Sequence, residues 1–147
     1  MKARNIAIIL ACGALLGASV AHAEESEKVR HARYESELEQ EAESTDAKCG
    51  TKIATSIDWA SFEGDAEWQK RSIASYCGSP LSALRRFCEG EKAKAYIQKT
   101  TKKLVCRAVK SKAEWKLLVK DGTLTWLIPP DATNADDFAR AQLLRSL

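Results

Sequence analysis

Four carboxylates lie among aromatic residues near the middle of the 147-residue chain, and this group is the one best suited to acid–base chemistry. The acids are Asp58, Glu63, Asp65 and Glu67, and the aromatic residues are Trp59, Phe62 and Trp68. Two carboxylates can hydrolyse a glycosidic bond, one as the acid and the other as base or nucleophile. The alternative is that Asp58 and Asp65 cap helices and the glutamates are solvated surface charges. A carboxylate-based hydrolase acting on glycans is therefore the second hypothesis for function.

Other catalytic sets are missing from the sequence after residue 23. General-base catalysis most often uses histidine, and the only histidine in this region, His31, lies in an acidic segment. The chain has no glycine-rich phosphate loop and no calcium loop. We therefore assign no catalytic residue, no cofactor and no metal site, and we expect a protein that is not an enzyme.

A run of cations occupies residues 92–120, where ten Lys and Arg residues stand against Glu114 alone. Such a run can face a polyanion, or its lysines can be solvated residues that guard edge strands. Nine of the ten are lysines, whereas specific phosphate recognition favours the forked guanidinium of arginine. The run thus favours a protein or an anionic envelope polymer over nucleic acid as partner. The candidate contact residues are Lys92, Lys94, Lys99, Lys102, Lys103, Lys110 and Lys112.

Residues 1–23 have the pattern of a secretory signal peptide. Two cations precede an apolar run of about 15 residues, and Ala21-His22-Ala23 fits a cleavage site. A membrane-spanning helix needs roughly 20 apolar residues, so the run is too short for an anchor. We predict cleavage after Ala23, export to a periplasm or the extracellular space, and no membrane span in the mature chain. Lipid attachment at Cys12 is the minor alternative.

Four cysteines follow the leader, namely Cys49, Cys77, Cys88 and Cys106. An even number in an exported chain predicts two disulfides, because the spacings of 28, 11 and 18 do not match the close ligand pairs of zinc sites. A Cys77–Cys88 bond is disfavoured, since an antiparallel helix pair would hold these residues apart. Between the other pairings, we favour Cys49 with Cys77 and Cys88 with Cys106.

Charge is distributed unevenly after the leader. Residues 24–48 hold nine acids and four bases, and residues 49–147 hold 17 bases and 11 acids. Val29, Tyr34 and Leu38 are the only larger apolar residues of the acidic segment, too few to offset the entropy of ordering it. We predict a disordered segment at 24–48, which could fold back onto the basic run, and one disulfide-stabilised domain at 49–147.

The first part of this domain has helical signals. Residues 53–62 fit either a strand or a helix. Asp65 can cap a helix that ends at Gly78, and Ser79-Pro80 can start a second one that ends at Gly90. The sequence predicts two short helices in a hairpin. Residues 91–101 fit a helix or a strand, and we take them as a helical turn that leads into a strand.

The second part of the domain has strand signals. Residues 104–109 favour a strand, and residues 115–128 favour a hairpin around Asp121-Gly122, a pair that suits a type I′ turn. The register that pairs Lys120 with Thr123 collects apolar side chains on one face. A C-terminal helix capped by Asn134 follows. The predicted fold class is α+β, with two short N-terminal helices, an antiparallel three- to four-stranded sheet and a C-terminal helix.

These observations give one leading expectation for function. The chain is expected to be a small exported domain that binds another macromolecule, either as an inhibitor or as a module that binds the envelope or a polyanion.

Overall fold

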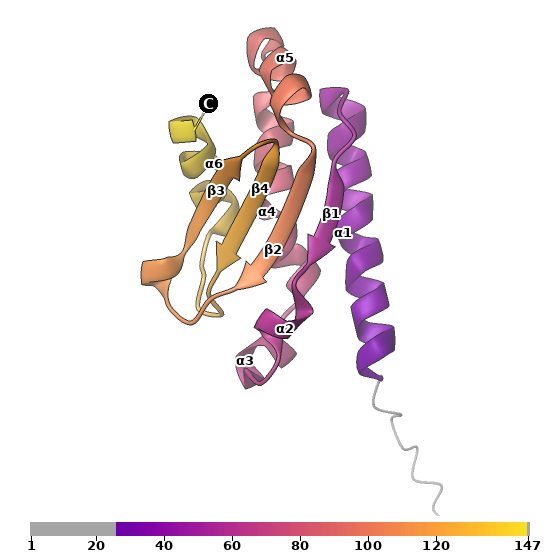
Figure 1. The fold of residues 1–147 in the computed structure, drawn as a ribbon, viewed down its shortest axis with the longest axis vertical. Coiled ribbons are helices and arrows are strands. Elements are labelled where there is room, and N and C mark those ends of the chain that lie inside the picture. The colour runs from indigo at the N-terminus through magenta and orange to yellow at the C-terminus, as the bar shows by residue number, and fades with distance from the viewer. Residues whose placement is uncertain (1–25, 147) are drawn as a thin grey trace, which may run out of the picture.

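The structure is a computed structural model that describes residues 26–146. The predicted signal peptide and the alternative lipid site at Cys12 lie outside these residues. Between residues 26 and 146, no helix is both long enough and apolar enough to cross a membrane. The elements, shown in Figure 1, are α1 (Glu27–Cys49), β1 (Ala54–Ile57), α2 (Trp59–Phe62), α3 (Ala66–Gln69), α4 (Ile73–Phe87), α5 (Glu91–Thr100), β2 (Lys103–Ala108), the 3-10 helix η1 (Lys112–Glu114), β3 (Lys116–Lys120), β4 (Thr123–Ile128) and α6 (Ala135–Ser146).

The four strands form one sheet in the order β1-β2-β4-β3. Strand β2 is parallel to both β1 and β4, and only the β3–β4 pair is antiparallel. The prediction of an antiparallel sheet is therefore wrong, although the expected number of strands and the mixture of helices with strands are confirmed. The physical reason is the connection from β1 to β2, which runs through four helices and is long enough to return the chain in the same direction.

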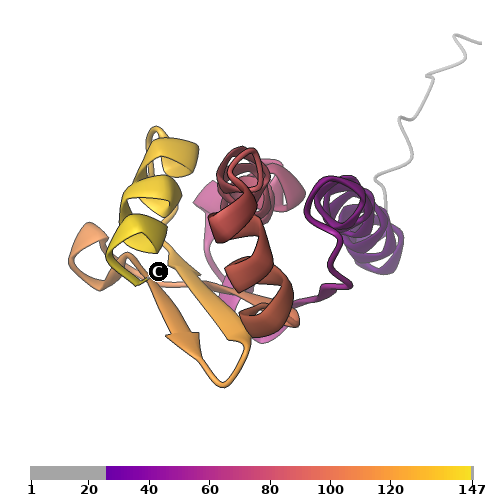
Figure 2. The same cartoon turned by 90° about the horizontal axis from the view of Figure 1, so that it is seen from above.

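The helices cover one face of the sheet. In Figure 2, α6, α4 and α1 lie side by side on the same side of the strands, and no helix or strand within residues 26–146 covers the opposite face. Strand side chains alternate accordingly, with Leu104, Leu124 and Trp126 buried beneath the helices. One layer of helices on one layer of strands thus leaves an open sheet face.

Helix α4 is a single helix where the sequence predicted two. It runs through Gly78, Ser79 and Pro80 without interruption. Proline lacks the N–H that would bond the carbonyl four residues earlier, which here belongs to Tyr76. That carbonyl instead accepts a hydrogen bond of 3.0 Å from the indole Nε1 of Trp126. A side chain from the sheet therefore replaces the missing helical hydrogen bond, an arrangement that local sequence rules do not reveal.

Helix α1 contradicts the predicted disorder of the segment 24–48 over its residues 27–48. Its 23 residues bury a stripe that packs on α4 and β1. The stripe continues past Tyr34 and Leu38 through Ala42, Thr45 and Cys49. The hydroxyl of Thr45 donates to the Glu41 carbonyl of its own helix and lies 3.3 Å from the Leu81 carbonyl of α4. The prediction failed because small and polar residues, rather than large apolar ones, complete this buried face, so the folded unit begins before residue 49.

The four cysteines form two disulfides, as predicted, but the pairing differs from the favoured one. Cys49 is bonded to Cys88, and Cys77 is bonded to Cys106. The first joins the ends of α1 and α4, and the second joins α4 to β2. The favoured pairing was wrong because it assumed that α1 was unfolded and that Cys77 and Cys88 lay on different helices. The exclusion of a Cys77–Cys88 bond is confirmed.

The hairpin and the preceding strand agree closely with their predictions. Strand β2 differs from the predicted 104–109 by one residue at each end. Strands β3 and β4 pair in the predicted register, from Lys120 with Thr123 to Lys116 with Leu127. Asp121 and Gly122 both have positive φ, as a type I′ turn requires. On the apolar face that this register predicts, Trp115 precedes β3 and packs against the core, whereas Val119 is 41% exposed.

Candidate interaction surfaces

The four candidate carboxylates occupy structural positions. An oxygen of Asp58 lies 2.8 Å from Nε of Arg107 in an ion pair. Asp65 precedes α3 and accepts a hydrogen bond of 2.9 Å from the backbone N–H of Glu67, whose carboxylate pairs with Lys70. Glu63 is exposed after α2. These are the positions expected of helix caps and surface charges.

The aromatic residues near these acids contribute to packing. Trp68 is only 2% exposed and meets the ring of Phe62 edge-on, so it offers no open platform for a sugar ring. Trp59 stacks on His31 with ring centroids 3.7 Å apart, and its indole Nε1 donates to Glu35 at 2.7 Å. Sequence reasoning missed this contact because it placed His31 in a disordered segment. Aromatic packing here fixes the N-terminal half of α1 against α2.

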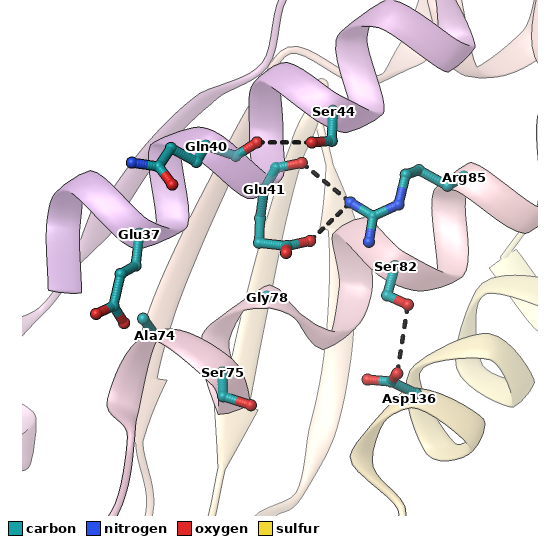
Figure 3. A pocket seen from close by; sticks show the side chains of 10 residues that line it. All are labelled: Glu37, Gln40, Glu41, Ser44, Ala74, Ser75, Gly78, Ser82, Arg85 and Asp136. Carbon is teal, nitrogen blue, oxygen red and sulfur yellow. Dashed lines mark hydrogen bonds and ion pairs between the residues drawn. The ribbon is translucent and has the colours of Figure 1, made fainter.

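A polar cavity of about 550 Å³ lies between α1 and α4, beside the first turn of α6, and Figure 3 shows its side chains. Two of its charged groups, Glu41 and Arg85, form an ion pair with each other, and Asp136 is contacted by a serine hydroxyl. The Glu41 carboxylate lies 2.7 Å from the Arg85 guanidinium, and the Ser82 hydroxyl lies 3.3 Å from Asp136. Gly78 of α4 faces the Glu41 side chain of α1, where a Cβ would be in ordinary van der Waals contact, 3.6 Å from the Glu41 Cγ. These contacts connect three helices.

The predicted lysine contacts do not form one patch. They divide into three groups along the chain: Lys92, Lys94 and Lys99 on α5, Lys102 and Lys103 at the start of β2, and Lys110 and Lys112 after its end. A strand advances about 3.3 Å per residue, so the second and third groups are roughly 20 Å apart. Lys112 also forms an ion pair with Asp131 at 3.7 Å. No described ion pair joins the acidic residues of α1 to the basic run.

Four cations of the basic run meet on the open sheet face. Opposite the buried Leu104 and Cys106 on β2, the alternate residues Lys103 and Arg107 point away from the helices. Lys116 and Lys120 of β3 lie on the same face. Lys116 pairs with Leu127 of β4, which also pairs with Arg107, and Lys120 pairs with Thr123, which also pairs with Lys103. Only Lys103 was among the predicted contacts. The signal that could have identified the other three is the alternation of side chains along a strand. It places residues 103 and 107 on one face of β2, and residues 116 and 120 on one face of β3.

The open face has a defined layout, with cations at both ends and two apolar residues and a threonine between them. One row across the sheet contains Lys103, Thr123 and Lys120, and another contains Arg107, Leu127 and Lys116. The rows lie about 13 Å apart, since four residues of strand separate them. The row between them contains Val105, Thr125 and Leu118, and Leu118 is 45% exposed.

The charges of this face are largely uncompensated. Arg107 is paired with Asp58, whereas the three lysines Lys103, Lys116 and Lys120 are exposed and form no ion pair with a residue of 26–146. The strand positions on this face include no acidic residue. The face therefore combines positive charge with one exposed apolar side chain, Leu118, and the partly exposed Val105 and Leu127.

Neither a metal cluster nor a known relative indicates a function. In the described part of the chain, no group of three or more His, Cys, Asp or Glu side chains could hold a metal ion. Comparison with family models, curated proteins and solved structures finds no match. The surfaces of this chain are therefore the basis for inferring what it does.

Proposed function

We propose that the protein is an exported, non-enzymatic interaction domain that binds an anionic polymer on its open sheet face. The observation that carries this proposal is the layout of the face, where four cations surround a partly exposed central row of Val105, Thr125 and Leu118. Exposed apolar surface of this kind is characteristic of interaction sites, and clustered positive charge attracts polyanions. The two disulfides support export, because such bonds persist in oxidising compartments.

The chemistry of the cations favours a polymer with repeated charges over a single bound phosphate group. Three of the four are lysines, which act as mobile point charges, and the one arginine already pairs with Asp58. Lysines held on separate rows can each meet a different charged group of a flexible chain. A sulfated or carboxylated polysaccharide fits this arrangement, and heparin is a suitable probe.

The test compares two charge-reversed variants with equal net charge. One carries Lys103→Glu, Lys116→Glu and Lys120→Glu on the open face. The matched control carries Lys92→Glu, Lys94→Glu and Lys99→Glu on α5, so it also tests the contacts predicted from the sequence. The measurement is the salt concentration that elutes each protein from a heparin column, with circular dichroism to confirm folding.

We expect the wild-type protein to bind heparin and the open-face variant to pass through at low salt. The α5 variant should retain most of the affinity, and binding by the wild type should weaken steeply as salt rises. Equal losses in both variants would show that only net charge matters, and retention of the open-face variant would contradict the proposal.

A further inference from the structure

The free edge of strand β1 exposes main-chain hydrogen-bonding groups. The N–H groups of Ala54 and Asp58 donate to the carbonyls of Lys102 and Cys106 along β2. Main-chain groups alternate in direction along a strand, so those of Thr55 and the N–H of Ile57 point away from β2. No strand lies beyond β1 in the described sheet. Thr55 therefore presents one donor and one acceptor in the geometry of an unfilled ladder.

A groove of about 480 Å³ runs between this edge and α1, which lies alongside β1 in Figure 1. Its apolar side chains are Leu38, Ile53 and Ile57, all of them buried. Its α1 wall carries Glu35 and Glu39, one helical turn apart and both exposed. We call this feature the α1–β1 groove. It combines an apolar floor, an acidic wall and free main-chain groups.

The walls of the groove are held in position before any partner binds. The Glu35 carboxylate accepts the Trp59 indole N–H at 2.7 Å. At the start of β1, the Ile53 N–H lies 3.0 and 3.1 Å from the two carboxylate oxygens of Asp46 on α1. A surface ordered in this way loses less entropy on binding than a flexible one.

The two edges of the sheet differ in how they are protected. Exposed edges are commonly blocked by lysine or proline, and β3 carries Lys116 and Lys120 at its ends. Strand β1 consists of Ala54, Thr55, Ser56 and Ile57, and contains neither lysine nor proline. The β1 edge thus lacks the residues that would prevent pairing with another strand.

We propose that the α1–β1 groove binds an extended, basic segment of another protein, which adds to β1 as a fifth strand. Strand addition would satisfy the main-chain groups of Thr55 and Ile57. Lysine or arginine side chains of the segment would meet Glu35 and Glu39 on the acidic wall of the groove. The charged residues of this groove lie on α1 and have the opposite sign to the cations on β2 and β3 of the open sheet face, so the proposal does not depend on polymer binding.

Charge also argues against a second copy of this chain as the occupant. Pairing two β1 edges would bring the acidic walls of both copies together, and like charges in close contact oppose association. A basic partner has the complementary charge. Dimer formation through β1 is therefore an outcome that the test must detect.

The experiment measures binding of a fluorescein-labelled peptide of four Lys-Val repeats by anisotropy, with a Glu-Val peptide of equal length as control. Thr55→Pro removes the outward N–H but leaves the β1–β2 hydrogen bonds in place. Glu39→Lys reverses one charge of the wall. Its matched control, Glu37→Lys, makes the same change in charge on the side of α1 that faces the α4 cavity. Hydrogen exchange of the Thr55 and Ile57 amides reports strand addition directly.

We expect the basic peptide to bind and the acidic one to fail. Thr55→Pro should weaken binding about tenfold, as expected for the loss of one hydrogen bond. Glu39→Lys should weaken it several-fold, and Glu37→Lys should have little effect. The bound peptide should slow exchange at Thr55 and Ile57.

Three results would overturn the proposal. They are equal losses for the two glutamate variants, unchanged exchange at the two amides in the presence of saturating peptide, and a concentration-dependent dimer that Thr55→Pro abolishes. The glutamate variants decide the matter even if the proline variant does not fold. The open-face triple variant should still bind the peptide, which separates this inference from the heparin result.

Discussion

The open sheet face and the α1–β1 groove meet at strand β1 but have opposite charge. The face obtains its cations from alternate strand positions such as Lys103 and Arg107, and the groove obtains its acids from helix positions four apart, Glu35 and Glu39. Along the sequence, both α1 and the basic run 92–120 contain charges of both signs, because Arg33 lies close to the acids of α1 and Glu114 lies in the basic run. Side chains alternate between the two faces of a strand and recur every 3.6 residues on a helix. Residues of one sign can therefore share a surface even where the sequence mixes both signs.

The two disulfides offer the strongest way to separate these surfaces. Cys49→Ala with Cys88→Ala frees the end of α1, which forms a wall of the groove, and Cys77→Ala with Cys106→Ala frees β2 from α4. The bonds join residues 39 and 29 positions apart, so the entropy model predicts similar losses, about 2–4 kcal/mol of unfolding free energy each. Urea unfolding followed by tryptophan fluorescence measures the loss.

Binding should distinguish the two disulfide variants under conditions where both remain folded. The variant without Cys49–Cys88 should lose affinity for the basic peptide more than for heparin. The variant without Cys77–Cys106 should show the reverse order. Identical changes in both assays would mean that the helical layer and the sheet respond as one rigid unit.

Local signals predicted the hairpin far better than the long-range arrangement of the chain. The Asp121-Gly122 turn and the alternation of residues 116–128 determine the β3–β4 register within a short stretch. Disulfide pairing and parallel strand order depend instead on how distant elements pack. The continuous α4 illustrates this limit, because Trp126 supplies the hydrogen bond that makes Pro80 tolerable in the helix.

A smaller effect is expected at the junction of α1 and β1. Asp46 accepts hydrogen bonds from the Ile53 N–H and, at 2.7 Å, from the Thr51 hydroxyl. Asp46→Ala should lower the unfolding free energy by about 2 kcal/mol, because it leaves a part-buried donor without its charged acceptor. The affinity of this variant for the basic peptide should also fall, whereas the salt concentration that elutes it from heparin should be unchanged. Thr51→Val is the control that removes only the hydroxyl, and a larger loss there would refute the role given to Asp46.

The sequence predicted the chemistry of the candidate sites better than their geometry. It indicated that the basic run was the main concentration of positive charge, but its chosen lysines lie on three separate parts of the fold. The acidic wall could not be foreseen, since it requires α1 to be folded. The α1 stripe depends on Ala42 and Thr45, which gain their stabilising contacts only from the packed core.

The smallest effect is expected at Asp65, whose substitution should change neither binding at the open sheet face nor binding at the α1–β1 groove. Asp65→Ala removes the cap of α3 and should lower the unfolding free energy by about 1 kcal/mol. Heparin retention and peptide affinity should be unchanged, because α3 contributes to neither surface. The variant and the wild-type protein should both fail to release reducing ends from peptidoglycan or other polysaccharides. Release by the wild type that is lost in Asp65→Ala would instead establish the carboxylate hydrolase, since a helix cap has no reason to affect bond cleavage in a folded protein.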